Sequence, residues 1–155
     1  MANPEIEGVV ENCDLFKGLD KDNIGKIAGL CQVETYEQGE YIFRQGDFGD
    51  SIYIIAEGQV FLERSMDMGV RKGNAVIGIL GKGRAFGCWS ALLDEAHNLM
   101  SSASCQKATG VVVIKGKDLR DMMVSDVSLG FSILERLCIL LRDRIQGALG
   151  AMEKV

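Results

Sequence analysis

The spacing of glycine restricts the folds open to this chain more than any other feature. The sequence has 19 glycines and a single proline. Most of the glycines fall between residues 39 and 87, at the ends of short apolar segments. Because glycine adopts a positive φ without a steric penalty, it favours tight turns at such places. The pattern predicts a sheet of many short strands.

The segments between these turns have the period of strands. From Val33 onward, apolar side chains alternate with polar neighbours, as they do in half-buried strands. The alternating positions include Val33, Thr35, Tyr41, Phe43, Ile52, Ile54, Val60 and Leu62. We expect a further pair of strands, residues 76–80 and 111–114, to close the all-β section.

Helical periods flank this section on both sides. We predict N-terminal helices in residues 1–31, the strands in residues 32–115, and C-terminal helices in residues 116–155. No linker or repeat divides these parts, and 155 residues is a common size for one folded unit. We therefore expect a single domain over residues 1–155.

The last helix carries more apolar surface than one packing face requires. Residues 127–149 contain no proline and predict one long helix. Its apolar residues recur at spacings of three and four, which suit a two-fold coiled-coil seam. We expect a homodimer along Leu134, Leu137, Leu141 and Ile145, and the alternative is a helix buried within its own domain.

Composition argues against several classes of protein. The net charge of −5 gives no general cationic surface for nucleic acid, and no apolar run approaches the roughly 20 residues that span a membrane. Five scattered cysteines and an N-terminus without a secretory pattern predict reduced thiols in the cytoplasm. The one histidine, His97, leaves a metal-dependent β-roll enzyme without paired ligands. We expect no enzyme, no membrane and no nucleic acid bound by this chain alone.

Three segments resemble a known family. LFKGL (15–19), GEYIFRQGD (39–47) and SIYIIAEGQV (51–60) resemble the effector domains of the catabolite-activator/FNR family and cyclic-nucleotide-binding domains generally. The resemblance covers about residues 15–145. It implies a mainly β fold with flanking helices: a cyclic-nucleotide-binding-like β-roll, or double-stranded β-helix, followed by a long dimerisation helix. It also implies a regulatory, ligand-sensing function.

A fourth stretch resembles the family's phosphate-binding cassette. FGCWSALL (86–93), followed by LMSSAS (99–104), reads as a glycine, a short helix over residues 88–94 and a returning strand. The N-terminus of a helix offers unpaired N–H groups to an anion. The implied ligand is a cyclic nucleotide or another small anion, with no other cofactor. The residues implied to bind it are Gly87, Cys88, Trp89, Ser90, Ala91, Leu99, Met100, Ser101 and Ser102.

Both charged anchors of that cassette are absent. In the family pattern a glutamate holds the ribose hydroxyl and an arginine pairs with the cyclic phosphate. Cys88 or Trp89 stands in place of the glutamate, and Leu99 or Met100 in place of the arginine. Because charge-assisted hydrogen bonds are worth roughly 1.5–3 kcal/mol each, we expect cyclic AMP to bind about a hundredfold more weakly or not at all.

The donors that remain are neutral ones. They are the backbone N–H groups of residues 87–91 and the hydroxyls of Ser90, Ser101 and Ser102. We expect these groups to hold any occupant of the pocket. Tight binding of cyclic AMP would require another basic residue, and the candidate is Arg84.

Three side chains near the cassette have competing interpretations. We expect Trp89 to fill the volume of a nucleotide, and the alternative is stacking on an aromatic ligand. His97 with Cys88 or Cys105 could ligate haem iron, but we expect a surface loop histidine. Cys88 could act as a redox sensor, but we expect a passive small residue.

Three functional hypotheses follow. The first is a ligand sensor in which the pocket helix shifts the packing of the long helix that starts near Val127. The second is a degenerate domain that serves only as a dimerisation or interaction module. The third is the sensory half of a transcription regulator, whose helix-turn-helix domain would follow the long helix.

Overall fold

Two four-stranded antiparallel sheets and a short two-stranded ladder form the β-roll of this protein, in a computed structural model that describes residues 3–95 and 97–153. The outermost residues of the expected domain, 1–2 and 154–155, lie outside this description. The first sheet has the order β1 (Cys31–Tyr36), β10 (Thr109–Lys115), β4 (Ser51–Glu57), β7 (Ala85–Gly87). The second has the order β2 (Tyr41–Phe43), β9 (Ser102–Cys105), β5 (Val60–Asp67), β6 (Lys72–Leu80), and the ladder joins β3 (Phe48–Gly49) to β8 (His97–Asn98).

The expected pairing of residues 76–80 with residues 111–114 is wrong. β6 pairs with β5, its neighbour along the chain, through a hairpin. β10 lies in the other sheet, between β1 and β4. Its buried, β-branched sequence suits a central strand, and strands that are close in sequence usually pair with each other. Periodicity identified both strands without indicating their partners.

The helices lie before, within and after the β-roll. They are α1 (Asn3–Glu11), α2 (Lys21–Ala28), the 3₁₀ helix η1 (Trp89–Leu93), α3 (Gly116–Ser125) and α4 (Val127–Met152). The carboxylates of Asp20 and Asp126 accept hydrogen bonds from the N–H groups of Asn23 and Leu129, which caps α2 and α4 at their N-termini. The long C-terminal helix is thus confirmed. Residues 14–18 form turns instead of a helix, although Leu15 and Phe16 are fully buried.

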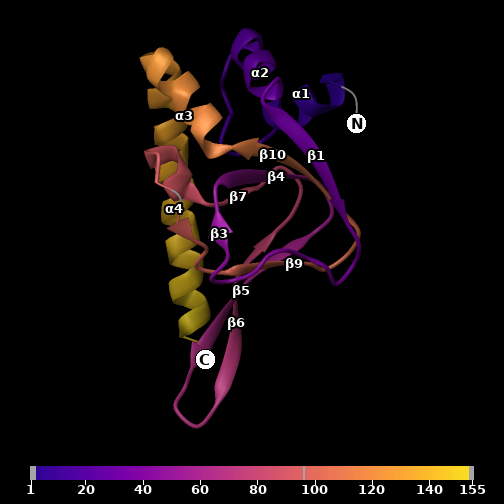
Figure 1. Cartoon of the computed structure of the whole chain (residues 1–155), viewed down its shortest axis with the longest axis vertical. Helices are drawn as coiled ribbons and strands as arrows, with labels where there is room; N and C mark the ends of the chain where they lie inside the picture. Colours follow the sequence, from indigo (N-terminus) through magenta and orange to yellow (C-terminus); the bar gives the residue numbers. More distant parts are fainter. Residues whose placement is uncertain (1–2, 96, 154–155) are drawn as a thin grey trace.

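Figure 1 shows how these elements surround the roll. α4 runs along one side of it, and α1 and α2 lie at one end. The β5–β6 hairpin extends away from the body of the roll toward the end of the chain, and α4 contacts β6. The inner side of α4 therefore faces the sheets over much of its length. Among the residues that the structure describes, no helix is long and apolar enough to cross a membrane.

Two groups of buried side chains hold the fold together. The helix-side core packs the helices against β4 and β10, and its fully buried members include Leu15, Phe16, Ile27, Ile52 and Ile133. The roll core lies inside the β-roll, and its members include Phe43, Ile55, Leu62, Phe86 and Leu99. Three aromatic rings in this region, Phe43, Tyr53 and Phe86, have centroids 5.4–5.8 Å apart.

The apolar residues that α4 leaves exposed differ from those of the expected dimer seam. Leu137 is only 7% exposed because it packs into the helix-side core, so it is not available to a second chain. The large apolar side chains left exposed on α4 are Val127, Phe131, Leu134, Ile145, Leu149 and Met152. We call these six residues the outer stripe of α4. They confirm that the helix has surplus apolar surface, on a face beside the one that includes Leu137.

Candidate functional site

A cavity of about 450 Å³ lies between the β-roll and α4. Its lining from the roll is Phe43, Leu62, Arg64, Ile77, Gly87, Trp89, Leu99, Met100 and Ser101. Its lining from α4 is Leu141, Arg144, Ile145 and Ala148. The cavity has the size usual for small-molecule sites, and its walls are mainly apolar. Five of the nine predicted site residues, Gly87, Trp89, Leu99, Met100 and Ser101, line it, whereas Cys88, Ser90, Ala91 and Ser102 are not part of this lining.

Gly87 is held by packing between strands. Its φ is +128°, and a Cβ atom there would lie 2.6 Å from the Ser51 carbonyl oxygen. The next residue, Cys88, donates its N–H to the same carbonyl at 3.1 Å. The resemblance to the cassette implied that this glycine binds the ligand. The structure gives a different reason, since β4 closes the side where a side chain would stand.

η1 faces α3 as well as the cavity. The Ala91 N–H donates to the Cys88 carbonyl at 3.3 Å, so this predicted anion donor is already used within the protein. On the other side, a Cβ atom on Gly116 would overlap the Ala91 Cβ. The Arg120 guanidinium donates to the Leu92 carbonyl at 2.6 Å. Ala91 therefore fixes η1 against the start of α3.

The two candidate anchors on the returning segment have different environments. Leu99 is 8% exposed and belongs to the roll core, while Met100 is 69% exposed at the edge of the cavity. The hydroxyl of Ser102 accepts a hydrogen bond from the Gln45 N–H at 2.8 Å. Ser102 thus joins β9 to the chain that follows β2, and of the three predicted hydroxyls only Ser101 borders the cavity.

Trp89 and Cys88 are neighbours in sequence but pack against different cores. Trp89 packs against the helix-side core and borders the cavity, which remains open beside it. The expectation that Trp89 fills the volume of a nucleotide stays a prediction. Cys88 is 5% exposed within the roll core, as expected of a passive small residue.

His97 is exposed on β8, and its Nδ1 lies 2.7 Å from the Asn98 carbonyl oxygen. This histidine does not line the cavity between the roll and α4. Within residues 3–95 and 97–153, no three or more histidine, cysteine, aspartate or glutamate side chains gather as metal ligands do.

The charged residues of the cavity come from elements outside the cassette. Arg64 lies on β5, and its Nη1 donates to the Met100 carbonyl. Arg144 lies on α4, and its Nη2 donates to the Ala85 carbonyl at 2.8 Å. Sequence reasoning missed both residues. The sequence did contain a sign of Arg144, which lies three residues after Leu141 and four before Ala148. On a helix this spacing places its charge on the same face as those two apolar residues.

Arg84, the predicted substitute cation, is engaged elsewhere. Its Nε pairs with the Asp14 carboxylate at 3.0 Å, and it does not line the cavity. The same carboxylate accepts the Ala85 N–H at 3.0 Å. The carbonyl of Asp14 accepts a hydrogen bond from Arg136 Nε at 2.9 Å. Asp14 therefore joins the segment before Gly87 to α4.

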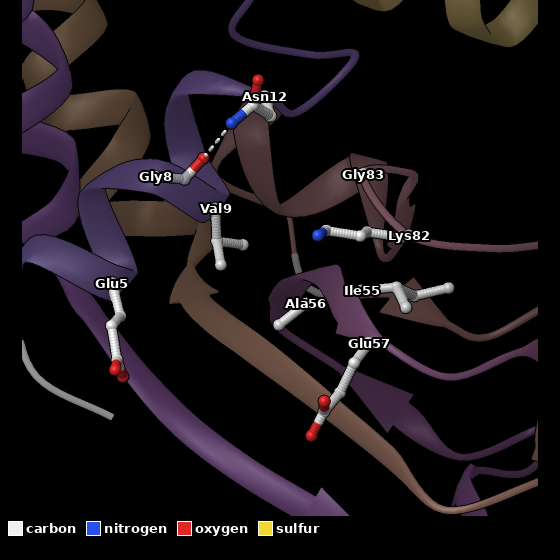
Figure 2. Close-up of a pocket in the computed structure, with 9 residues that line it drawn as sticks. All are labelled: Glu5, Gly8, Val9, Asn12, Ile55, Ala56, Glu57, Lys82 and Gly83. Atoms are coloured by element: carbon white, nitrogen blue, oxygen red, sulfur yellow. Dashed lines mark hydrogen bonds between the residues drawn. The ribbon is translucent and has the colours of Figure 1, made fainter.

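A second cavity, of about 510 Å³, lies at the other end of the roll, between α1 and the end of β4 (Figure 2). Lys82 extends toward α1 in this view, and the carboxylates of Glu5 and Glu57 belong to the same lining. The Asn12 side chain donates to the Gly8 carbonyl at 2.8 Å. No predicted site residue lies here, and the mixed charges favour no single class of ligand.

Comparison with known proteins identifies relatives of the chain. A family model described as "Cyclic nucleotide-binding domain" matches residues 33–126. The cyclic AMP receptor protein of Thermus thermophilus is 35% identical over 92 residues, which are 59% of this chain and 41% of the receptor. The cGMP-dependent protein kinase 2 of Mus musculus is 30% identical over 94 residues, which are 61% of this chain and 12% of the kinase. The alignment thus spans less than half the length of either relative.

Solved structures share the fold. A cyclic nucleotide-binding domain from Methylobacillus flagellatus superposes with a TM-score of 0.79 at 21% identity, over 99% of this chain and 84% of that one. The catabolite activator protein of Thermus thermophilus gives a TM-score of 0.70 at 28% identity, over 90% of this chain and 62% of that one. Both superpositions cover nearly the whole chain.

Proposed function

This chain belongs to the cyclic nucleotide-binding domain family, and we propose on that basis that it is a non-catalytic regulatory domain that binds a small anion between the β-roll and α4. We propose that residues 1–155 work as one domain. We also propose a cytoplasmic location, which is supported by the five cysteines, all of them free thiols.

The observation that carries the proposal is the position of the cavity. One wall is the β-roll with Gly87 and Trp89 of the predicted cassette, and the other is α4. A ligand in this space contacts both walls at once. It therefore changes the relative free energies of different packings of α4 against the roll, which is what a regulatory ligand must do.

A contiguous route connects η1 to the start of α4. Ala91 lies against Gly116, and Leu92 accepts a hydrogen bond from Arg120, so η1 is joined to α3 in two ways. A Cβ atom on Gly130 of α4 would lie 2.7 Å from the Met123 carbonyl oxygen of α3. Contacts this close do not absorb a displacement easily. We propose that movement of η1 is relayed to α4 by α3.

The partner that we propose for the outer stripe of α4 is a second copy of this chain. Val127, Phe131 and Leu134 recur at spacings of four and three, as do Ile145, Leu149 and Met152. We expect sedimentation at micromolar concentration to give a dimer, and Phe131→Asp to give a monomer. Val124→Asp is the control, because Val124 is equally exposed but lies on α3. A wild-type monomer would refute the dimer.

Ligand binding is tested by titration calorimetry and thermal unfolding with cyclic AMP, cyclic GMP and 5′-AMP. A ligand at a hundred times its dissociation constant adds about 2.7 kcal/mol to stability, so even weak binding is measurable. We expect cyclic AMP to bind about a hundredfold more weakly than a cassette with both charged anchors would allow. A low-micromolar dissociation constant for cyclic AMP would overturn the expectation of weak binding. No stabilisation by any anion would favour the interaction-module hypothesis instead.

A further inference from the structure

The charge of the cavity is opposite to the charge of the chain. The sequence has 22 acidic and 17 basic residues. Among the described residues that line the cavity between the roll and α4, however, the charged ones are two arginines, Arg64 and Arg144, and none is acidic. Nearly all the other lining side chains are apolar. Such a wall attracts an anion and offers it little competing negative charge.

The buried guanidinium of Arg144 has fewer hydrogen-bond partners than it has donors. This group carries five N–H donors, and the structure shows a hydrogen bond from Nη2 to the Ala85 carbonyl. The Nε atom is buried without a hydrogen-bond partner among the described residues. Burial, with a smaller effect from nearby Arg84, lowers the pKa of Arg144 to about 10. An incoming oxyanion would accept a hydrogen bond from Nε and would also compensate for the burial of the positive charge.

The carboxylate of Asp14 acts on Arg144 through its charge but is bonded to other groups. Asp14 contributes some favourable charge, but its carboxylate accepts hydrogen bonds from Arg84 Nε and the Ala85 N–H. Arg144 itself bonds to a neutral carbonyl. Among the described residues, no carboxylate forms an ion pair with Arg144.

Arg64 supplies a second guanidinium at the mouth of the cavity. It is exposed, and it bonds to the carbonyl of Met100, a residue that is itself 69% exposed. The same lining includes Phe43, Leu62 and Leu99 from the roll core. The cavity therefore combines an apolar interior with cationic groups from two different elements.

Resting on the function proposed above, we infer that this cavity selects molecules with an apolar, ring-sized body and one oxyanion group, and that Arg144 and Arg64 bind the oxyanion. The anchors then lie on α4 and β5, where they replace the missing cassette side chains. Because Arg144 belongs to α4, the residue that recognises the anion is also part of the helix to be moved.

Two dyes of similar shape test this inference. The first, 8-anilinonaphthalene-1-sulfonate, has an apolar body and a sulfonate, and N-phenyl-1-naphthylamine has the same rings without charge. We expect Arg144→Gln and Arg64→Gln each to weaken binding of the sulfonate about tenfold. We expect either variant to change binding of the neutral dye less than twofold. The control is Arg142→Gln, because Arg142 lies exposed on the same helix beside Asp143; it should alter neither dye.

The outcomes separate the inference from the proposed function. An equal loss for both dyes in the variants, or no loss for either, would overturn anion selection while leaving a ligand-binding cavity. Failure of both dyes to bind the wild-type protein would overturn the proposed ligand site and the inference with it. Circular dichroism shows whether Arg144→Gln folds. The exposed Arg64→Gln gives an independent answer if it does not.

Discussion

The helix-side core and the roll core differ in what surrounds them. The helix-side core joins helices to a sheet, and Phe16, Ile27 and Ile133 in it are fully buried. The roll core instead borders a cavity through Phe43, Leu62 and Leu99. α4 takes part in both regions, since Ile133 and Leu137 pack in the first and Arg144 lines the second. The helix-side core therefore joins several elements, whereas part of the roll core borders open space.

The largest effect should come from truncation in the helix-side core. We expect Ile133→Ala to lower the free energy of unfolding by about 3–4 kcal/mol, because the removed atoms leave a closed void. Urea denaturation measures this loss. Val124→Ala is the control, since this side chain is 64% exposed and its loss should cost no more than about 0.5 kcal/mol. An equal cost for the two variants would contradict the assignment of this core.

A smaller effect should follow from truncation at the cavity wall. Leu99 packs against Gly49 on one side, where a Cβ atom would lie 2.9 Å from its Cγ, but borders empty space on the other. We therefore expect Leu99→Ala to cost about 2 kcal/mol, at the lower end of the range for buried leucine. Urea denaturation measures this loss as well. A loss as large as that of Ile133→Ala would show that the two cores do not differ as described.

The smallest effect is the dependence of stability on pH in the helix-side core. Burial raises the pKa of the Cys31 thiol to about 12. The native thiol stays protonated at a pH where the thiol of the unfolded chain already ionises. The contribution of Cys31 to the free energy of unfolding is therefore complete below the ordinary thiol pKa, and it is lost as the pH rises from there toward the raised pKa of the native thiol. Burial also raises the pKa of Cys13 in the same core.

Cys31→Ser tests that dependence. A serine hydroxyl can still donate to the Ile27 carbonyl, which the thiol contacts at 3.2 Å, but it does not ionise in this range. We expect the variant to lose about 1 kcal/mol less stability than the wild type between pH 9 and 10. Chemical denaturation at several pH values measures the slope. Identical slopes would place the alkaline sensitivity elsewhere, for example at Cys13.

Local patterns in the sequence predicted much of the fold. Alternation identified the strands, and the proline-free stripe after Val127 identified α4. Strand partners were harder, because β10 pairs with β1 and β4, which are distant in sequence, and no local pattern specifies such contacts. The cavity was harder still. Arg64 and Arg144 come to line one cavity only through the packing of the whole fold, and neither residue belongs to the cassette motif.

Gly87 also limits the shape of the ligand that we propose for this cavity. The Ser51 carbonyl blocks the cavity behind this residue, and the aromatic rings of Phe43, Tyr53 and Phe86 occupy the roll beyond it. A chemical series built on a bound fragment therefore has no room to extend in that direction. Its substituents have to grow outward, past Arg64, Met100 and Ile145, where the side chains are exposed. Because Ile145 also belongs to the outer stripe of α4, a bulky substituent on this side would test the proposed dimer as well as the proposed ligand site.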